Sequence, residues 1–192
     1  SEILSPKFIV PFASMVRFCH KENSYMNDSI NTPRTTVDFI NATTASKPFL
    51  MVPYEKWDGQ SSKDNEKAMK FWDDAYGLAL QRELIKQKKT YSLDEIHIAY
   101  DGMVKRVKNK NNILCIRVLS FFGLIPEQTI KVSDINLAIK FSWHKGFTIV
   151  EGEGQFVEMT SESIYFLFSF DFGIDSLNVN ARFSGKLSQK KK

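Results

Sequence analysis

The sequence predicts an α+β fold in which helices pack on one face of a mainly antiparallel sheet. Two segments with helical capping signals occupy the middle of the chain, and beyond residue 112 the hydrophobic period changes from 3.6 to 2. A hydrophobic content of 43%, with 16 Phe among 192 residues, is enough to fill a real core.

The first ninety residues are poor in strands. Two short apolar runs limited by prolines, residues 6–13 and 47–53, predict strands. Residues 20–36 are polar and rich in turn formers, so they predict a long loop, after which Thr36 caps a short helix. Ser61-x-x-Asp64, followed by apolar residues at helical spacing, predicts the start of a long helix.

The second half begins with a helix and continues mainly as strands. Ser92-x-x-Glu95 predicts the helix start and Asn111-Asn112 its end. Apolar alternation or β-rich composition predicts strands over 113–125, 135–143, 147–150, 155–159 and 176–183, with a hairpin turn at 144–146. Thr160 or Ser161 caps a further helix, which Gly173 is expected to end.

These elements predict three parts. Residues 1–90 hold strand, loop, strand and long helix, which is too little for an independent sheet, whereas residues 91–185 hold a complete α+β set. Residues 186–192 are a basic tail. Because the front part is incomplete and the chain opens on Ser1 without Met, we expect a fragment of a longer protein.

The net charge of +4 comes from the end of the chain. The last nine residues hold four lysines and no acid, and the rest has 22 cations against 22 anions. A neutral body lacks the broad basic face that neutralises several phosphates, so no nucleic-acid partner is expected.

Composition also predicts the compartment. Cys19 and Cys115 are too few for a disulfide framework. There is no apolar run of about 18 residues and no signal-peptide pattern. We therefore expect a soluble, cytoplasmic protein with no membrane partner.

Catalytic and metal motifs are missing. The three histidines form no H-x-H or H-E-x-x-H motif and the cysteines no C-x-x-C motif, so no metal site and no catalytic residue is assigned within the chain. Cys19 and His20 are adjacent, but a nucleophile and its base must meet through side-chain geometry, so a hydrolase using this pair is the weakest hypothesis.

Several segments resemble metallo-β-lactamase-fold proteins of the CMP-N-acetylneuraminate hydroxylase-like kind. Pro11-Phe12-Ala13-Ser14, followed by His20, Tyr25 and Asn31-Thr32, resembles the last strand of their metal-binding core and the loop after it. The matches that continue in the same order are KPFLMVPYEKW at 47–57, DEIHIAY at 94–100 and the stretch 173–183.

The resemblance implies a role for each part of the chain. Residues 1–90 would be the tail end of the metallo-β-lactamase-like core, and residues 91–185 an accessory domain with a sterol-carrier-like fold. The H-x-H-x-D-H motif of that core, and the iron–sulfur module of some relatives, are absent from these residues. Any zinc or iron would therefore lie in an upstream domain of the same protein.

The resemblance also implies a loop bordering the active-site mouth. Its candidate substrate-side residues are Ser14, His20, Glu22, Asn23, Tyr25 and Asn27.

The first functional hypothesis is a non-catalytic C-terminal accessory region that supplies packing, this loop and a surface for a homodimer. The alternative is a module whose aromatic sheet and helix enclose a small apolar or lipid-like ligand.

Overall fold

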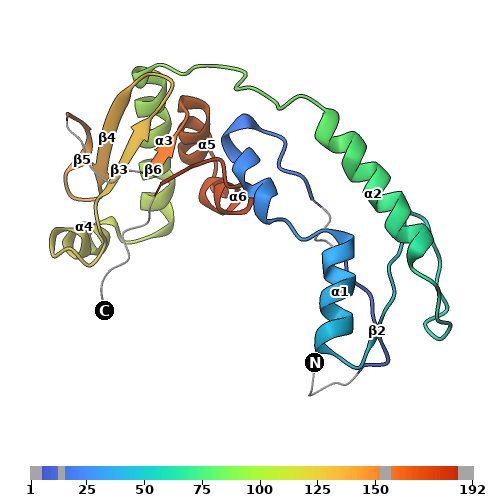
Figure 1. Cartoon of the computed structure of the whole chain (residues 1–192). Coiled ribbons are helices and arrows are strands. Elements are labelled where there is room, and N and C mark those ends of the chain that lie inside the picture. Colours follow the sequence, from blue (N-terminus) through green and yellow to red (C-terminus); the bar gives the residue numbers. More distant parts are fainter. Residues whose placement is uncertain (1–5, 13–15, 152–156, 186–192) are drawn as a thin grey trace. The chain divides into compact units, whose positions relative to one another are not determined.

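The computed structural model describes residues 6–12, 16–151 and 157–185. Residue contacts divide the chain into two compact units (Figure 1). The first comprises Ser1–Cys19 and Tyr25–Leu84, and the second comprises His20–Ser24 and Ile85–Lys192. The pentapeptide His20–Ser24 is thus part of the C-terminal unit, although it lies far upstream in sequence. Helices and a four-stranded sheet among the described residues confirm the predicted α+β class.

Most of the regular secondary structure of the first unit is helical. Its elements are β1 (Phe8–Ile9), α1 (Pro33–Thr43), β2 (Lys47–Pro48) and α2 (Glu66–Gln81), and the 3-10 helix η1 (Lys21–Ser29) runs into it from the second unit. The two short strands pair in parallel. Val37, Leu50, Ala68 and Met69 form its buried core.

Three predictions for residues 20–66 were wrong. Residues 20–36 are not a loop, because they contain η1 and the start of α1. Thr32, not Thr36, caps α1: its side chain accepts a hydrogen bond from the Thr35 amide, and Pro33 fills the first helical position. Helix α2 begins at Glu66 rather than near Ser61.

The second unit is a sheet covered by helices. Its elements are α3 (Leu93–Lys110), α4 (Ile113–Phe121), β3 (Gln128–Val132), β4 (Leu137–Ser142), β5 (Gly146–Val150), β6 (Val157–Met159), α5 (Ser161–Ser169) and α6 (Gly173–Asn180). The strand order is β5-β4-β3-β6, with β6 parallel to β3 and the other pairs antiparallel. Residues 155 and 156 of the strand predicted over 155–159 lie outside the described residues.

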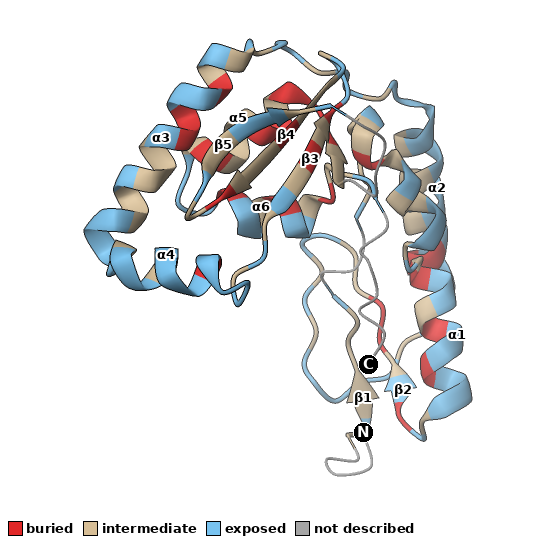
Figure 2. Ribbon diagram, turned by 90° about the vertical axis from the view of Figure 1, so that its left-hand side faces the viewer, coloured by how far each residue is buried: buried red, intermediate tan, exposed pale blue. Residues whose placement is uncertain are grey.

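Helices α3 and α5 supply most of the apolar cover of this sheet (Figure 2). The buried cluster combines two α3 side chains, Ile96 and Tyr100, with Ile139 of β4 and Phe168 of α5. Period-2 patterning therefore identifies the inner face of β4, whereas β3 was not predicted.

The predicted capping signals of the second unit are confirmed. Ser92 and Glu95 form a reciprocal capping box at the start of α3. Thr160 caps α5 by accepting from the Ser163 amide.

The strand predicted over 113–125 is instead the helix α4. Asn112 caps it, because its side-chain oxygen accepts from the amides of Leu114 and Cys115. Gly123, at φ 73°, ends it: the Leu124 amide donates to the Leu119 carbonyl and the Gly123 amide to the Ser120 carbonyl. A continuous apolar run has no period of its own, so the two ends decide its conformation.

The strand predicted over 176–183 is also wrong, because α6 covers Gly173–Asn180. Leu177 and Ala181 are buried four residues apart, which is helical spacing, and the left-handed Ala181 ends the helix by donating to the Leu177 carbonyl. Gly173 begins this helix rather than ending the previous one. A Cβ atom there would lie 2.5 Å from the Leu167 carbonyl oxygen, so the residue permits a close backbone approach between α5 and α6.

Candidate functional site

Three of the predicted substrate-side residues, His20, Glu22 and Asn23, belong to the second unit, where the start of the 3-10 helix η1 stands in place of the predicted loop. The Glu22 carboxylate accepts two hydrogen bonds from Arg182, from Nε at 2.9 Å and Nη2 at 3.2 Å. It also accepts from the hydroxyls of Thr160 at 3.0 Å and Ser163 at 2.9 Å. Arg182 in turn donates to Glu162 at 2.8 Å. The side chains of Glu22 and Arg182 are only 16% and 14% exposed, so this is a largely buried ionic cluster.

The cluster fixes the charge of Glu22. Burial by itself would raise the pKa of this carboxyl, but the Arg182 guanidinium and the two hydroxyls outweigh burial and hold the pKa below its usual range. For Arg182, burial opposes the charged form while Glu22 and Glu162 favour it, and the net effect raises its pKa. Both groups therefore stay ionised near neutral pH, and the carboxylate is engaged by four donors rather than available as a general base.

Asn23 holds the same pentapeptide through its side chain. Its Oδ1 accepts from the His20 amide at 3.0 Å, and its Nδ2 donates to the Asn180 carbonyl at 2.7 Å. The Lys21 amide donates to the Ile85 carbonyl at 3.0 Å. With Glu22, these bonds attach the segment 20–24 to the linker before α3, to α5 and to the end of α6.

The imidazole of His20 lies close to this cluster. Its Nδ1 atom is buried and has no hydrogen-bond partner among the described residues. Burial and the nearby charge of Arg182 both lower the pKa of His20, and Glu22 and Glu162 only partly oppose them. His20 is therefore predominantly neutral at pH 7.

The remaining candidates belong to the first unit or lie outside the described residues. Asn27 belongs to the first unit, where its side chain accepts from the Phe18 amide at 2.8 Å and donates to the Phe18 carbonyl at 2.9 Å. Tyr25, in the same unit, is half exposed. Ser14 lies outside the described residues.

A polar hollow of about 460 Å³ lies beside Glu22. Its lining residues are Lys21, Glu22, Lys86, Gln87, Ser133 and Thr160. Lysine, amide and hydroxyl groups would suit a polar ligand carrying negative charge.

Next to this hollow, Asp134 organises the start of α5. It accepts from the Ser161 amide at 2.7 Å, the Ser161 hydroxyl at 2.6 Å and the Gln87 side chain at 2.5 Å. Burial would raise the pKa of Asp134, and these bonds reverse that effect and lower it. The Ser161 hydroxyl also accepts from the Tyr91 amide at 2.8 Å, which ties the linker to the helix.

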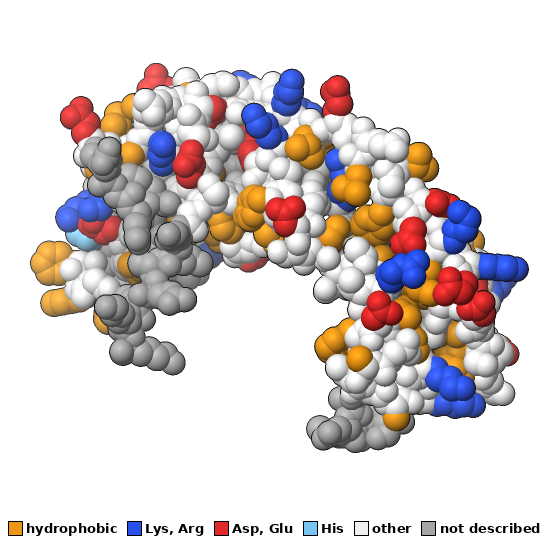
Figure 3. All heavy atoms as spheres, in the orientation of Figure 1, with side chains coloured by type: hydrophobic (Ala, Val, Ile, Leu, Met, Phe, Trp, Pro, Cys, Tyr) orange, Lys and Arg blue, Asp and Glu red, His pale blue; other side chains and the backbone are white. Residues whose placement is uncertain are grey.

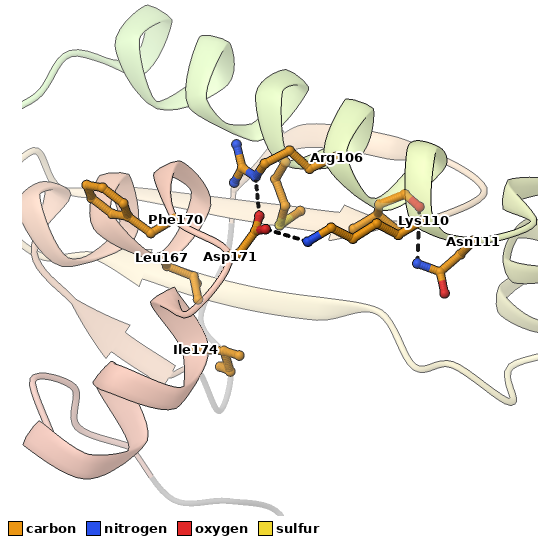
Figure 4. A pocket seen from close by; sticks show the side chains of 9 residues that line it. Arg106, Lys110, Asn111, Leu167, Phe170, Asp171 and Ile174 are labelled. Atoms are coloured by element: carbon orange, nitrogen blue, oxygen red, sulfur yellow. Dashed lines mark hydrogen bonds and ion pairs between the residues drawn. The ribbon is translucent and has the colours of Figure 1, made fainter.

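A second, more apolar hollow of about 260 Å³ lies between α3, α5 and α6 (Figure 4). Its lining residues are Met103, Arg106, Val107, Lys110, Asn111, Leu167, Phe170, Asp171 and Ile174. Asp171 pairs with both Arg106, at 2.8 Å, and Lys110, at 2.5 Å, so the cations at this hollow are already neutralised in part.

The described residues hold neither a cluster of metal ligands nor a hydrogen-bonded pair of Cys19 and His20. Within 6–12, 16–151 and 157–185, no three His, Cys, Asp or Glu side chains gather as metal ligands. The Cys19 thiol donates to the Arg17 carbonyl at 3.4 Å, and no hydrogen bond to an imidazole activates it in this part of the chain.

Arg182, Thr160 and Ser163 are the site residues that sequence reasoning missed. Arg182 is 160 positions from Glu22, and no local pattern links residues that far apart. The capping role of Thr160 was predictable, whereas the second role of its hydroxyl, toward Glu22, was not.

No protein-family model matches the chain, and neither the curated proteins nor the solved structures give a significant match.

Proposed function

We propose that this chain is a non-catalytic C-terminal accessory region of a metallo-β-lactamase-fold protein, in which a sterol-carrier-like second unit holds a substrate-side loop. The observation that carries the proposal is the attachment of His20–Ser24 to the second unit through Glu22. A buried charge is retained most readily where it specifies one arrangement of two segments. Here the two segments are the loop and the α5–α6 region.

The polar side chains of segment 20–24 are hydrogen-bonded within the fold, which supports a role in positioning this segment rather than in catalysis. The Glu22 carboxylate and the Asn23 amide are occupied by structural partners. Reactive chemistry would then come from elsewhere, namely a zinc or iron centre in an upstream domain of the same protein. What this chain contributes is the segment 20–24 in a fixed conformation, with the hollow beside Glu22 as the place for a polar part of the substrate.

The test combines the coding sequence upstream of Ser1 with metal analysis. We expect an in-frame H-x-H-x-D-H motif upstream, and the extended protein should retain zinc or iron through gel filtration while this chain alone should not. A start codon directly before Ser1, or tight stoichiometric metal binding by the 192 residues alone, would refute the proposal.

The apolar hollow of Figure 4 favours the second candidate function, binding of a small apolar or lipid-like ligand. Its volume of about 260 Å³ is slightly below the usual range for ligand sites, which restricts it to a small ligand. Titration with a small fluorescent apolar probe such as 1-aminoanthracene tests this candidate. Ile174→Asp should abolish binding, while Val179→Asp, on the same helix but outside the hollow, should not. Equal binding by both variants would place the probe elsewhere.

A further inference from the structure

Helix α4 has an unusual distribution of side chains for a helix in water. Of its nine residues, all of which the structure describes, only Ser120 is buried, and the Ser120 hydroxyl is hydrogen-bonded to Nδ1 of His144 at 3.0 Å. Large apolar side chains of the same segment are 41% to 71% exposed: Leu114, Val118, Leu119, Phe121, Phe122 and Leu124. We call these six residues the α4 apolar face. A helix that packs against the core of its own unit buries its apolar side chains and exposes its polar ones, and α4 does the opposite.

This face is contiguous along the chain and held in place at both ends. The Asn112 cap and the turn at Gly123 fix the helix ends, so the exposure does not come from a frayed segment. Figure 3 shows hydrophobic side chains at the surface in the part of the second unit where Figure 1 labels α4. Exposed apolar groups gathered in this way mark an interaction surface.

The charges around α4 indicate what covers it. Residues 102–126 contain five cations and no acid. Arg106 and Lys110 pair with Asp171, whereas Lys105, Lys108 and Arg117 make no ion pair within the described part of the chain. Lys105 and Lys108 precede the apolar face on α3 and Arg117 lies within α4, so the sequence around this face carries cations that no described ion pair neutralises.

Arg117 adds a second feature beside the helix. With Lys145 it lines a hollow of about 290 Å³ between α3, α4 and the β4–β5 turn, where Asp101 is the only acid among the described residues. Lys145 is already paired with Glu127 at 2.9 Å, whereas Arg117 makes no ion pair in the described part of the chain. An anionic group next to α4 would therefore meet the Arg117 guanidinium there.

We propose that the α4 apolar face docks on a bilayer surface that carries anionic headgroups. Phe and Leu side chains would enter the boundary between headgroups and acyl chains, and Lys105, Lys108 and Arg117 would face the lipid phosphates. A second copy of this chain fits less well, because a two-fold contact would bring the same cations together. No described helix is long and apolar enough to cross a bilayer, and surface docking does not need one. The inference goes beyond the accessory role proposed above and changes the expectation of no membrane partner.

Vesicle flotation of the complete 192-residue chain tests the proposal. Vesicles of phosphatidylcholine with roughly one third phosphatidylglycerol should bind the chain at least tenfold more strongly than phosphatidylcholine alone, and binding should weaken in about 1 M salt. The double variant Phe121→Ser, Phe122→Ser should lose binding at least tenfold. The matched control, Ile98→Ser with Val179→Ser, removes two exposed apolar side chains of the same unit away from α4 and should bind like the wild type.

A charge pair completes the design. Lys108→Gln with Arg117→Gln should weaken binding several-fold, whereas Lys56→Gln with Lys67→Gln, which alters two exposed lysines of the first unit, should not. All variants keep the C-terminal lysines, so binding that survives in the Phe121, Phe122 variant would assign vesicle attraction to those lysines and overturn the proposal. Failure of the wild type to bind anionic vesicles also overturns the proposal. Sedimentation then tests whether the two phenylalanines hold a dimer or an acidic protein instead. Unchanged far-UV circular dichroism and melting temperature establish that each variant is folded.

Discussion

At the residue scale, Glu22 should contribute strongly to stability. Glu22→Ala leaves Arg182 with one carboxylate partner in a largely buried position, and breaking such a pair costs about 3 kcal/mol. Urea denaturation of the second unit measures the loss. Glu151→Ala removes an exposed acid of the same unit and should change the free energy of unfolding by less than about 0.5 kcal/mol. Equal effects of the two variants would show that the ionic cluster is energetically unimportant.

The lowered pKa of His20 predicts that the free energy of unfolding depends on pH. Its pKa in the folded chain lies below its ordinary value of 6.5, so the unfolded chain binds the proton more readily. The unfolding free energy should therefore fall as the pH decreases from 6.5 toward the folded-state pKa. Protonation of Glu22 also lowers the unfolding free energy, but only below about pH 4.5, because the pKa of Glu22 in the folded chain lies below 4.5.

The measurement is a series of urea midpoints between about pH 7 and about pH 5. His20→Gln should flatten the slope over this range, because it removes the titrating group. An unchanged slope in the variant would mean that His20 is not the group responsible.

The hydrogen-bond partners of a residue were predictable from sequence where they lie a few positions away, and they were not where they lie far along the chain. The Ser92 and Glu95 capping box spans three positions, so its spacing alone identified it. The same reasoning placed Glu22 in a loop, but its partners lie 138 to 160 positions away.

At the element scale, substitution of Gly173 should destabilise the fold. Gly173→Ala places a methyl group 2.5 Å from the Leu167 carbonyl oxygen, and this backbone cannot move without shifting α5, so a loss of about 1 to 3 kcal/mol is expected. Gly102→Ala is the control within the same unit: its nearest neighbour is the flexible end of Arg106 at 3.5 Å, and alanine favours the α3 helix by about 0.5 to 1 kcal/mol. Thermal melting should separate the two variants in sign. A stabilising Gly173→Ala change would contradict the close approach.

Both mistaken strands share a physical cause. Residues 113–121 are apolar almost throughout, and residues 176–183 alternate, so side-chain polarity alone did not distinguish strand from helix. The Asn112 cap stabilises the start of α4, and the left-handed Ala181 ends α6, so both segments are helical. The alternating strand around Ile139 was predicted correctly because its alternate apolar side chains, Ile139 and Phe141, pack in the buried cluster of the second unit.

At the scale of the whole molecule, the two units have separate cores and should respond separately to core mutations. Phe168→Ala opens a cavity in the second unit and should cost about 3 to 5 kcal/mol there. Leu50→Ala should have a comparable effect of about 2 to 5 kcal/mol in the first unit. Hydrogen exchange followed by mass spectrometry resolves the two, because each variant should accelerate exchange chiefly in its own unit. Uniform acceleration across the chain in both variants would show one cooperative core instead.

The division at this scale was only partly visible in the sequence. The predicted boundary lay between residues 90 and 91, and residue contacts divide the chain between Leu84 and Ile85. The membership of His20–Ser24 in the second unit depends on contacts between residues far apart in sequence. This membership is also the basis of the proposed accessory role.

Hydrogen exchange of the amides of Lys21 and Asn23, which donate to Ile85 and His20, tests this central claim most directly. Both amides should be protected in the wild type and should exchange at least tenfold faster in Glu22→Gln, while Glu151→Gln leaves them protected and β4 remains protected in both variants. Equal exchange of residues 20–24 in Glu22→Gln and the wild type would contradict the claim that the Glu22 cluster holds the loop.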